Sequence, residues 1–125
     1  MKSINQMIQE IHDNAVSKGW WVNPRSFGEL IALIHSEASE ALEDFRAGNS
    51  PNEVWYEKVI DGQVVRRGVP VDETWKPCGI PSELADIVIR VMDVCGRYGI
   101  DLEQAIMEKM AHNRTRPQRH GGKVI

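Results

Sequence analysis

The chain has 125 residues, of which 42% are hydrophobic and 26% are charged, and its net charge at pH 7 is −3. This composition excludes a largely disordered chain, and no apolar run approaches the ~20 residues of a membrane-spanning helix. The N-terminus lacks the apolar core of a signal peptide, and two cysteines make neither a disulfide framework nor a zinc site. We therefore expect a cytoplasmic protein of one domain over residues 1–125, with no membrane contact and a core small enough to favour oligomers.

Two amphipathic helices are predicted in the first part of the chain. Apolar residues recur at helical spacing over residues 4–15, with Ser3 as the N-cap. A second apolar stripe covers residues 30–45, with Ser26 as its N-cap and a glutamate three positions later as the capping-box partner. A glycine follows each stripe, which is typical of a helix end.

Residues 49–80 break the helical pattern. Short apolar segments flank Asp61–Gly62, a strong signal for the turn of a β-hairpin, and three prolines follow. The sequence thus predicts a short β-hairpin and an irregular loop, inserted between the second and the third helix.

Two more helices are predicted after the insert. Pro81 suits the first turn of the third helix, whose apolar stripe covers residues 84–95. Asp101 is the expected N-cap of the fourth helix, which Pro117 stops. Four helices with short links predict an all-α fold, a four-helix bundle with the hairpin as an insertion.

Paired acidic residues are the feature that points to chemistry. Glu37 and Glu40 are three positions apart in the second helix, and Glu83 and Asp86 have the same spacing in the third. Residues at this spacing project from one helix face, so two such pairs that face each other would bring four carboxylates together beside the core. A divalent cation would relieve their repulsion, and an all-oxygen site favours Mg²⁺ or Mn²⁺.

Solvated helix surface is the alternative interpretation of these acids. Glu43, Asp44 and Asp93 fit that alternative, and Arg90, four positions after Asp86, could simply form an ion pair with it. The matched spacing of the two pairs beside apolar stripes favours the metal site.

The C-terminal segment is basic, because no acidic residue follows Glu108. Lys109 and Asn113 are four positions apart on the fourth helix, and Arg116 follows at its end. Such donors beside a bound Mg²⁺ suit a polyphosphate, whereas a nucleic-acid contact or a solvated helix end is the alternative. Residues 117–125 are predicted to be a basic tail.

A resemblance to a known family rests on four segments. Together they resemble the MazG-like all-α nucleotide pyrophosphohydrolases, in particular the subgroup found in phages and bacteria. The first two segments match the paired ExxE and ExxD motif, and the others match the C-terminal part and an N-terminal loop of that subgroup. The segments are residues 36–43 (SEASEALE), 83–90 (ELADIVIR), 109–123 (beginning KMAHNRTRP) and 18–21 (KGWW).

The resemblance implies a MazG-like bundle that hydrolyses a nucleoside triphosphate, often a deoxynucleotide, to the monophosphate and pyrophosphate. It implies that Mg²⁺ is held by the two acidic pairs and that the protein is a homodimer or homotetramer. Glu40 or Glu37 would also be catalytic by taking a proton from the attacking water. The metal ligands it implies are Glu37, Glu40, Glu83 and Asp86.

The resemblance also gives roles to residues outside the acidic pairs. Lys109, Asn113 and Arg116 match the region that holds phosphates, and Trp20 or Trp21 could stack on the base, with a core or interface position as the alternative. The gap between the acidic pairs is longer than usual in the family. The insert that fills it could cover the nucleotide, aid assembly or do neither, so the base remains open.

A second class of function needs only the basic tail. In that hypothesis the protein is a non-enzymatic helical module that docks nucleic acid or an acidic partner. The acidic body of the chain speaks against a nucleic-acid partner, so the metal-dependent hydrolase is the preferred hypothesis.

Overall fold

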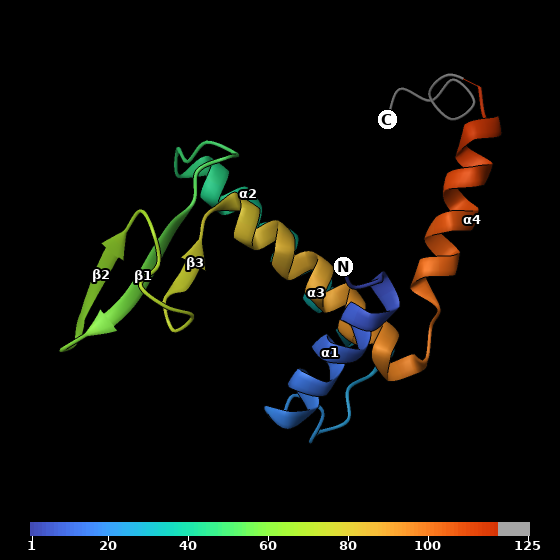
Figure 1. Cartoon of the computed structure of the whole chain (residues 1–125), viewed down its shortest axis with the longest axis horizontal. Coiled ribbons are helices and arrows are strands. Elements are labelled where there is room, and N and C mark those ends of the chain that lie inside the picture. The colour runs from blue at the N-terminus through green and yellow to red at the C-terminus, as the bar shows by residue number, and fades with distance from the viewer. Residues whose placement is uncertain (118–125) are drawn as a thin grey trace. The chain divides into compact units, whose positions relative to one another are not determined.

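The computed structural model describes residues 1–117 and shows four helices and a small sheet, whose strands come between the second and the third helix in the sequence (Figure 1). The predicted count of four helices is confirmed. In chain order the elements are α1 (Ile4–Ser17), α2 (Phe27–Arg46), β1 (Trp55–Ile60), β2 (Gln63–Arg67), β3 (Lys76–Cys78), α3 (Ile80–Tyr98) and α4 (Leu102–Thr115).

The helix starts follow the predicted capping residues. The hydroxyl oxygens of Ser3 and Ser26 and a carboxylate oxygen of Asp101 each accept a hydrogen bond from the backbone N–H three positions later. These contacts satisfy donors that the first helical turn leaves without a partner. Glycines with positive φ follow α1 and α2, as predicted, and Gly99 follows α3 in the same way.

The prediction of an all-α four-helix bundle is wrong, because the protein has a mixed α/β architecture. The hairpin is confirmed: β1 and β2 pair antiparallel across a turn in which Asp61 and Gly62 both have positive φ. A third strand, β3, pairs antiparallel with the other edge of β1, so the order is β2–β1–β3. Three residues with a central proline carry no strand periodicity, and an edge strand tolerates a proline.

The chain forms two compact units. The central unit is Asn23–Val91, with α2, the sheet and the first part of α3; the terminal unit is Met1–Val22 together with the chain from Met92 onward. Leu30, Trp75 and Ile80 are buried in the central unit, while Ile8 and Cys95 are buried in the terminal unit. Among the described residues, no helix has both the length and the apolarity to cross a bilayer.

Candidate metal centre

Three acidic side chains from α2 and α3 come together in the central unit. Glu37, Glu83 and Asp86 each offer a carboxylate oxygen, and these oxygens all lie within 4.8 Å of one another. Ligand oxygens around one Mg²⁺ at 2.0–2.1 Å lie roughly 3 to 4 Å apart. The three carboxylates thus lie close to the spacing of a divalent-cation site.

Glu37 is the buried member of this acidic cluster. Its side chain is 11% exposed, and its Oε1 accepts a hydrogen bond of 2.9 Å from Nε of Arg90 on α3. The guanidinium balances part of the cluster's negative charge and holds the carboxylate in place. The sequence pointed to Arg90 as a partner of Asp86, whereas the contact that orients Glu37 comes from across the helix pair.

Glu83 is the carboxylate whose ionised form is least satisfied. Its Oε2 atom is buried and has no hydrogen-bond partner among the described residues. Burial, a hydrogen bond with Glu40, and the charges of Glu40, Asp86 and Asp44 together raise the pKa of Glu83 from 4.5 to about 7. A proton shared with Glu40, or a cation, would satisfy this group.

Asp86 is affected by charges of both signs. Burial and the charge of Glu37 raise its pKa, while Lys76 and Arg90 oppose that rise. Lys76 belongs to β3, so the insert places a cation beside the acidic cluster. No sequence pattern pointed to Lys76, because its position depends on the pairing of β3 with β1.

Glu40, the fourth predicted ligand, is exposed and does not belong to the group of carboxylates that meet among the described residues, although its interaction with Glu83 helps to raise the pKa of Glu83. Asp44, four positions further along α2, is half-buried and also acts on Glu83. The sequence analysis assigns Asp44 to the solvated helix surface. Its spacing of seven from Glu37, which is two helical turns along the same face, could have indicated a position beside the cluster.

The predicted phosphate-binding residues are on a different part of the chain. Lys109 and Asn113 lie on α4 and Arg116 is its C-cap, in the terminal unit. Lys109 and Asn113 are exposed, and their spacing of four places them on one helix face. Their role in holding phosphates stays a prediction. Residues 118–125 of the predicted basic tail lie outside the described residues.

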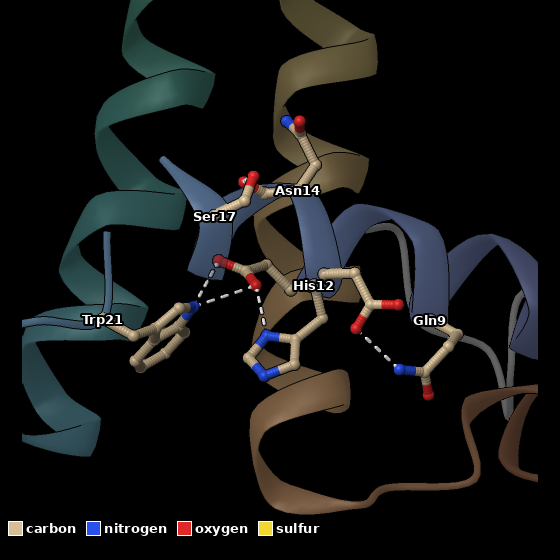
Figure 2. Close-up of polar contacts among 7 residues, drawn as sticks. Gln9, His12, Asn14, Ser17 and Trp21 are labelled. Atoms are coloured by element: carbon tan, nitrogen blue, oxygen red, sulfur yellow. Dashed lines mark hydrogen bonds and ion pairs between the residues drawn. The ribbon is translucent and has the colours of Figure 1, made fainter. Parts of the chain in front are cut away.

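The two tryptophans predicted to stack on the base differ in their surroundings. Trp20 is 49% exposed. The indole N–H of Trp21 donates to the carboxylate of Asp93 at 3.1 and 3.2 Å, and its ring meets His12 edge-on (Figure 2). Nδ1 of His12 lies 2.7 Å from the same carboxylate. Trp21 therefore has a packing role in the terminal unit, and base stacking by either tryptophan stays a prediction.

Comparison of the chain with family models, with curated proteins and with solved structures gave no match. The case for a function therefore rests on the site itself.

Proposed function

We propose that the protein is a metal-dependent nucleotide pyrophosphohydrolase that resembles the MazG-like enzymes. It would cleave (deoxy)nucleoside triphosphates to the monophosphate and pyrophosphate, with Mg²⁺, or Mn²⁺ in its place, as cofactor. The observation that carries the proposal is the acidic cluster: three carboxylate oxygens lie within 4.8 Å of one another, and one of these residues, Glu83, has a buried oxygen without a hydrogen-bond partner in the described part of the chain.

The acidic residues would have two different roles, metal binding and proton transfer. Glu37, Glu83 and Asp86 would hold the metal, and Arg90 keeps Glu37 oriented. When bound, Mg²⁺ supplies charge neutralisation for the phosphates and lowers the pKa of a water molecule. Glu40 is exposed and its charge acts on Glu83, so it is better placed than the buried Glu37 to accept a proton from an attacking water.

Phosphate and base recognition complete the proposal. Lys109, Asn113 and Arg116 would donate to phosphate oxygens, and charge-assisted bonds of this kind depend little on the base. Trp20, which is 49% exposed, offers more surface for a contact with the base than the half-buried Trp21.

We also propose that a second copy of this chain covers an apolar face of the central unit. Ile31, Leu42 and Phe45 on α2 are 37%, 54% and 59% exposed, and Leu84 and Val88 on α3 are 52% and 50% exposed. On each helix these residues follow helical spacing, so they form stripes of the kind that a bundle core requires. A homodimer or homotetramer would bury them.

The assembly proposal predicts a mass above that of one chain. Light scattering at micromolar concentration should give at least twice 14.2 kDa. A Leu42→Glu variant, which places a charge in the stripe, should shift the mass toward the monomer. A wild-type mass of 14.2 kDa across the concentration range would contradict a second copy on this face.

The enzymatic proposal is tested by pyrophosphate release from a panel of nucleoside triphosphates with Mg²⁺. The wild-type protein should release pyrophosphate, and Glu83→Gln should lose at least about a hundredfold in rate, the scale of losing one electrostatic catalytic group. Glu43→Gln is the matched control, because this α2 glutamate has a side chain that is 71% exposed and that, within residues 1–117, bonds only to Arg46. Equal rates for the two variants would refute the assignment.

A further inference from the structure

We propose that Lys76 on β3, together with Arg66 on β2, binds the terminal phosphates of the nucleotide, which leave as pyrophosphate. The inference rests on the proposed function and extends it, because it assigns to the sheet insert a part of the substrate that the acidic cluster alone would not hold. It concerns residues of the central unit only, so all of its evidence comes from one compact body.

The register of the sheet puts both cations on one face. Glu57 on β1 pairs with Arg66 on one side and with Lys76 on the other, and residues directly opposite in antiparallel strands project to the same face. Trp55, two positions before Glu57 on the same strand, belongs to this face, as does its partner Cys78. We call these five residues the basic sheet face; Lys58 and Arg67 lie on the opposite face.

The basic sheet face adjoins the start of α3, the helix that carries Glu83 and Asp86. A Cβ placed on Gly79, the residue between β3 and α3, would lie 3.3 Å from the ring of Trp55, and the Arg66 guanidinium stacks on that ring. Lys76 lies three positions before Gly79 on the same strand face as Cys78, so both cations lie at the part of the sheet from which α3 starts. The charge of Lys76 also opposes the rise in the pKa of Asp86, in agreement with this placement.

A single glycine joins the sheet to the helix that carries the ligands. Gly79 has a φ of +106°, and a Cβ placed on it would lie 2.3 Å from the carbonyl oxygen of Glu53. Only glycine fits this close approach without strain. The tight junction keeps β3 next to the first turn of α3, where Glu83 lies.

Both cations are exposed, and their own sheet does not neutralise them. Among the described residues, no carboxylate lies within ion-pair distance of Lys76 or Arg66, although Glu57 is opposite both. The Glu57 carboxylate accepts a hydrogen bond of 2.7 Å from the indole N–H of Trp55 instead. The Arg66 guanidinium lies 4.1 Å from the centre of the Trp55 ring, and stacking of this kind leaves its N–H groups open to an anion.

The chemistry of a polyphosphate fits this arrangement. A metal ion held by carboxylates neutralises only part of the triphosphate charge, and the remaining anionic oxygens need donors beside the metal. The alternative is that Lys76 does not contact a phosphate and only reduces the repulsion among the carboxylates by its positive charge. Under both roles, removal of Lys76 leaves the affinity for Mg²⁺ alone equal or higher, but only a phosphate contact predicts weaker binding of Mg²⁺–pyrophosphate, so the second probe tells them apart.

The test is calorimetry of the full chain with two probes, Mg²⁺ alone and Mg²⁺ with inorganic pyrophosphate. Lys76→Met should weaken the binding of Mg²⁺–pyrophosphate by about ten- to a hundredfold, the value of one charge-assisted hydrogen bond. Its affinity for Mg²⁺ alone should stay equal or rise, because a competing positive charge next to Asp86 is gone. The Arg66→Gln variant should show a smaller loss for pyrophosphate.

Matched controls come from the opposite face of the same strands. Lys58 donates to Thr74, and the Arg67 guanidinium lies 5.3 Å from the centre of the Trp75 ring, so Lys58→Met and Arg67→Gln alter equivalent residues away from the cluster. Both controls should bind Mg²⁺–pyrophosphate like the wild type.

Three results would overturn the inference. Unchanged pyrophosphate affinity in a folded Lys76→Met variant would remove the phosphate contact. If Lys76→Met bound Mg²⁺ alone more weakly, the role of Lys76 would be structural. If Lys58→Met lost as much affinity for Mg²⁺–pyrophosphate as Lys76→Met, the loss would be a general effect of charge. A wild-type protein that binds Mg²⁺–pyrophosphate but hydrolyses no nucleotide refutes the proposed function and leaves this binding result standing.

Discussion

Two aspartates on helix α3, Asp86 and Asp93, are seven residues apart and meet opposite chemical surroundings. Asp93, in the terminal unit, has a side chain that is 20% exposed and accepts hydrogen bonds from Trp21, with His12 at 2.7 Å. Asp86, in the central unit, is half-buried beside Glu37, and burial and that charge raise its pKa. Asp93 accepts hydrogen bonds from donors within the protein, whereas the positive charges of Lys76 and Arg90 offset only part of the effect that burial and Glu37 have on Asp86.

The contrast separates a structural acid from a candidate ligand. A buried carboxylate that is surrounded by donors regains most of the hydration free energy that it loses on burial. A carboxylate set beside other carboxylates keeps an unmet need for positive charge, which a metal ion can supply. The same residue type on one helix thus serves packing in one unit and chemistry in the other.

Replacement of each aspartate by asparagine is the strongest test of the difference between Asp86 and Asp93. Asp86→Asn should lower the rate of pyrophosphate release at least about a hundredfold, because a neutral amide is a poor ligand for Mg²⁺. Its stability should stay equal or rise, since repulsion with Glu37 falls. Initial rates with Mg²⁺ and a urea titration of the same sample measure both. Loss of the fold together with activity would make Asp86 structural instead.

Asp93→Asn should give the reverse pattern. The amide keeps one acceptor oxygen but loses the charge that strengthens the bonds from His12 and Trp21, so we expect about 1–3 kcal/mol lower stability. The rate per folded molecule should be close to that of the wild type. Urea denaturation measures the loss, and a drop in rate as large as that of Asp86→Asn would erase the distinction between the two sites.

The sequence predicted this contrast only in part. Both acidic pairs follow from spacing, because helical periodicity is local, and the capping residues Ser3 and Ser26 are equally local signals. Asp93 looked like solvated surface, since its partners His12 and Trp21 are 81 and 72 positions away along the chain. Lys76 was missed for the same reason: its place beside the cluster depends on a three-residue strand that pairs with the far edge of the hairpin.

The pH dependence of stability gives a further test of the acidic cluster, with a smaller expected effect. The folded protein without metal keeps a proton on Glu83 up to about pH 7, whereas the unfolded chain releases it near 4.5. Between these values the unfolded state binds fewer protons, so the contribution of Glu83 lowers stability as pH rises from about 4.5 to 7. Mg²⁺ should offset this loss most above pH 7, where the carboxylate is ionised.

The measurement is urea denaturation at several pH values between 5 and 8, with and without Mg²⁺. Other groups also titrate in this range, so the informative quantity is the difference between wild type and Glu83→Gln. That variant should lose the falling slope and the stabilisation by Mg²⁺ together. A wild-type slope that Glu83→Gln leaves unchanged would mean that the proton is held elsewhere.

The glycine junction between β3 and α3 has a consequence for the entropy of binding. Lys76 and Asp86 belong to one short stretch of main chain, in which a single residue separates the strand from the helix. The backbone freedom of that stretch is lost when the protein folds, so an arriving ligand need not order it again. The insert would therefore act as a preorganised half of the site rather than as a lid that closes on demand.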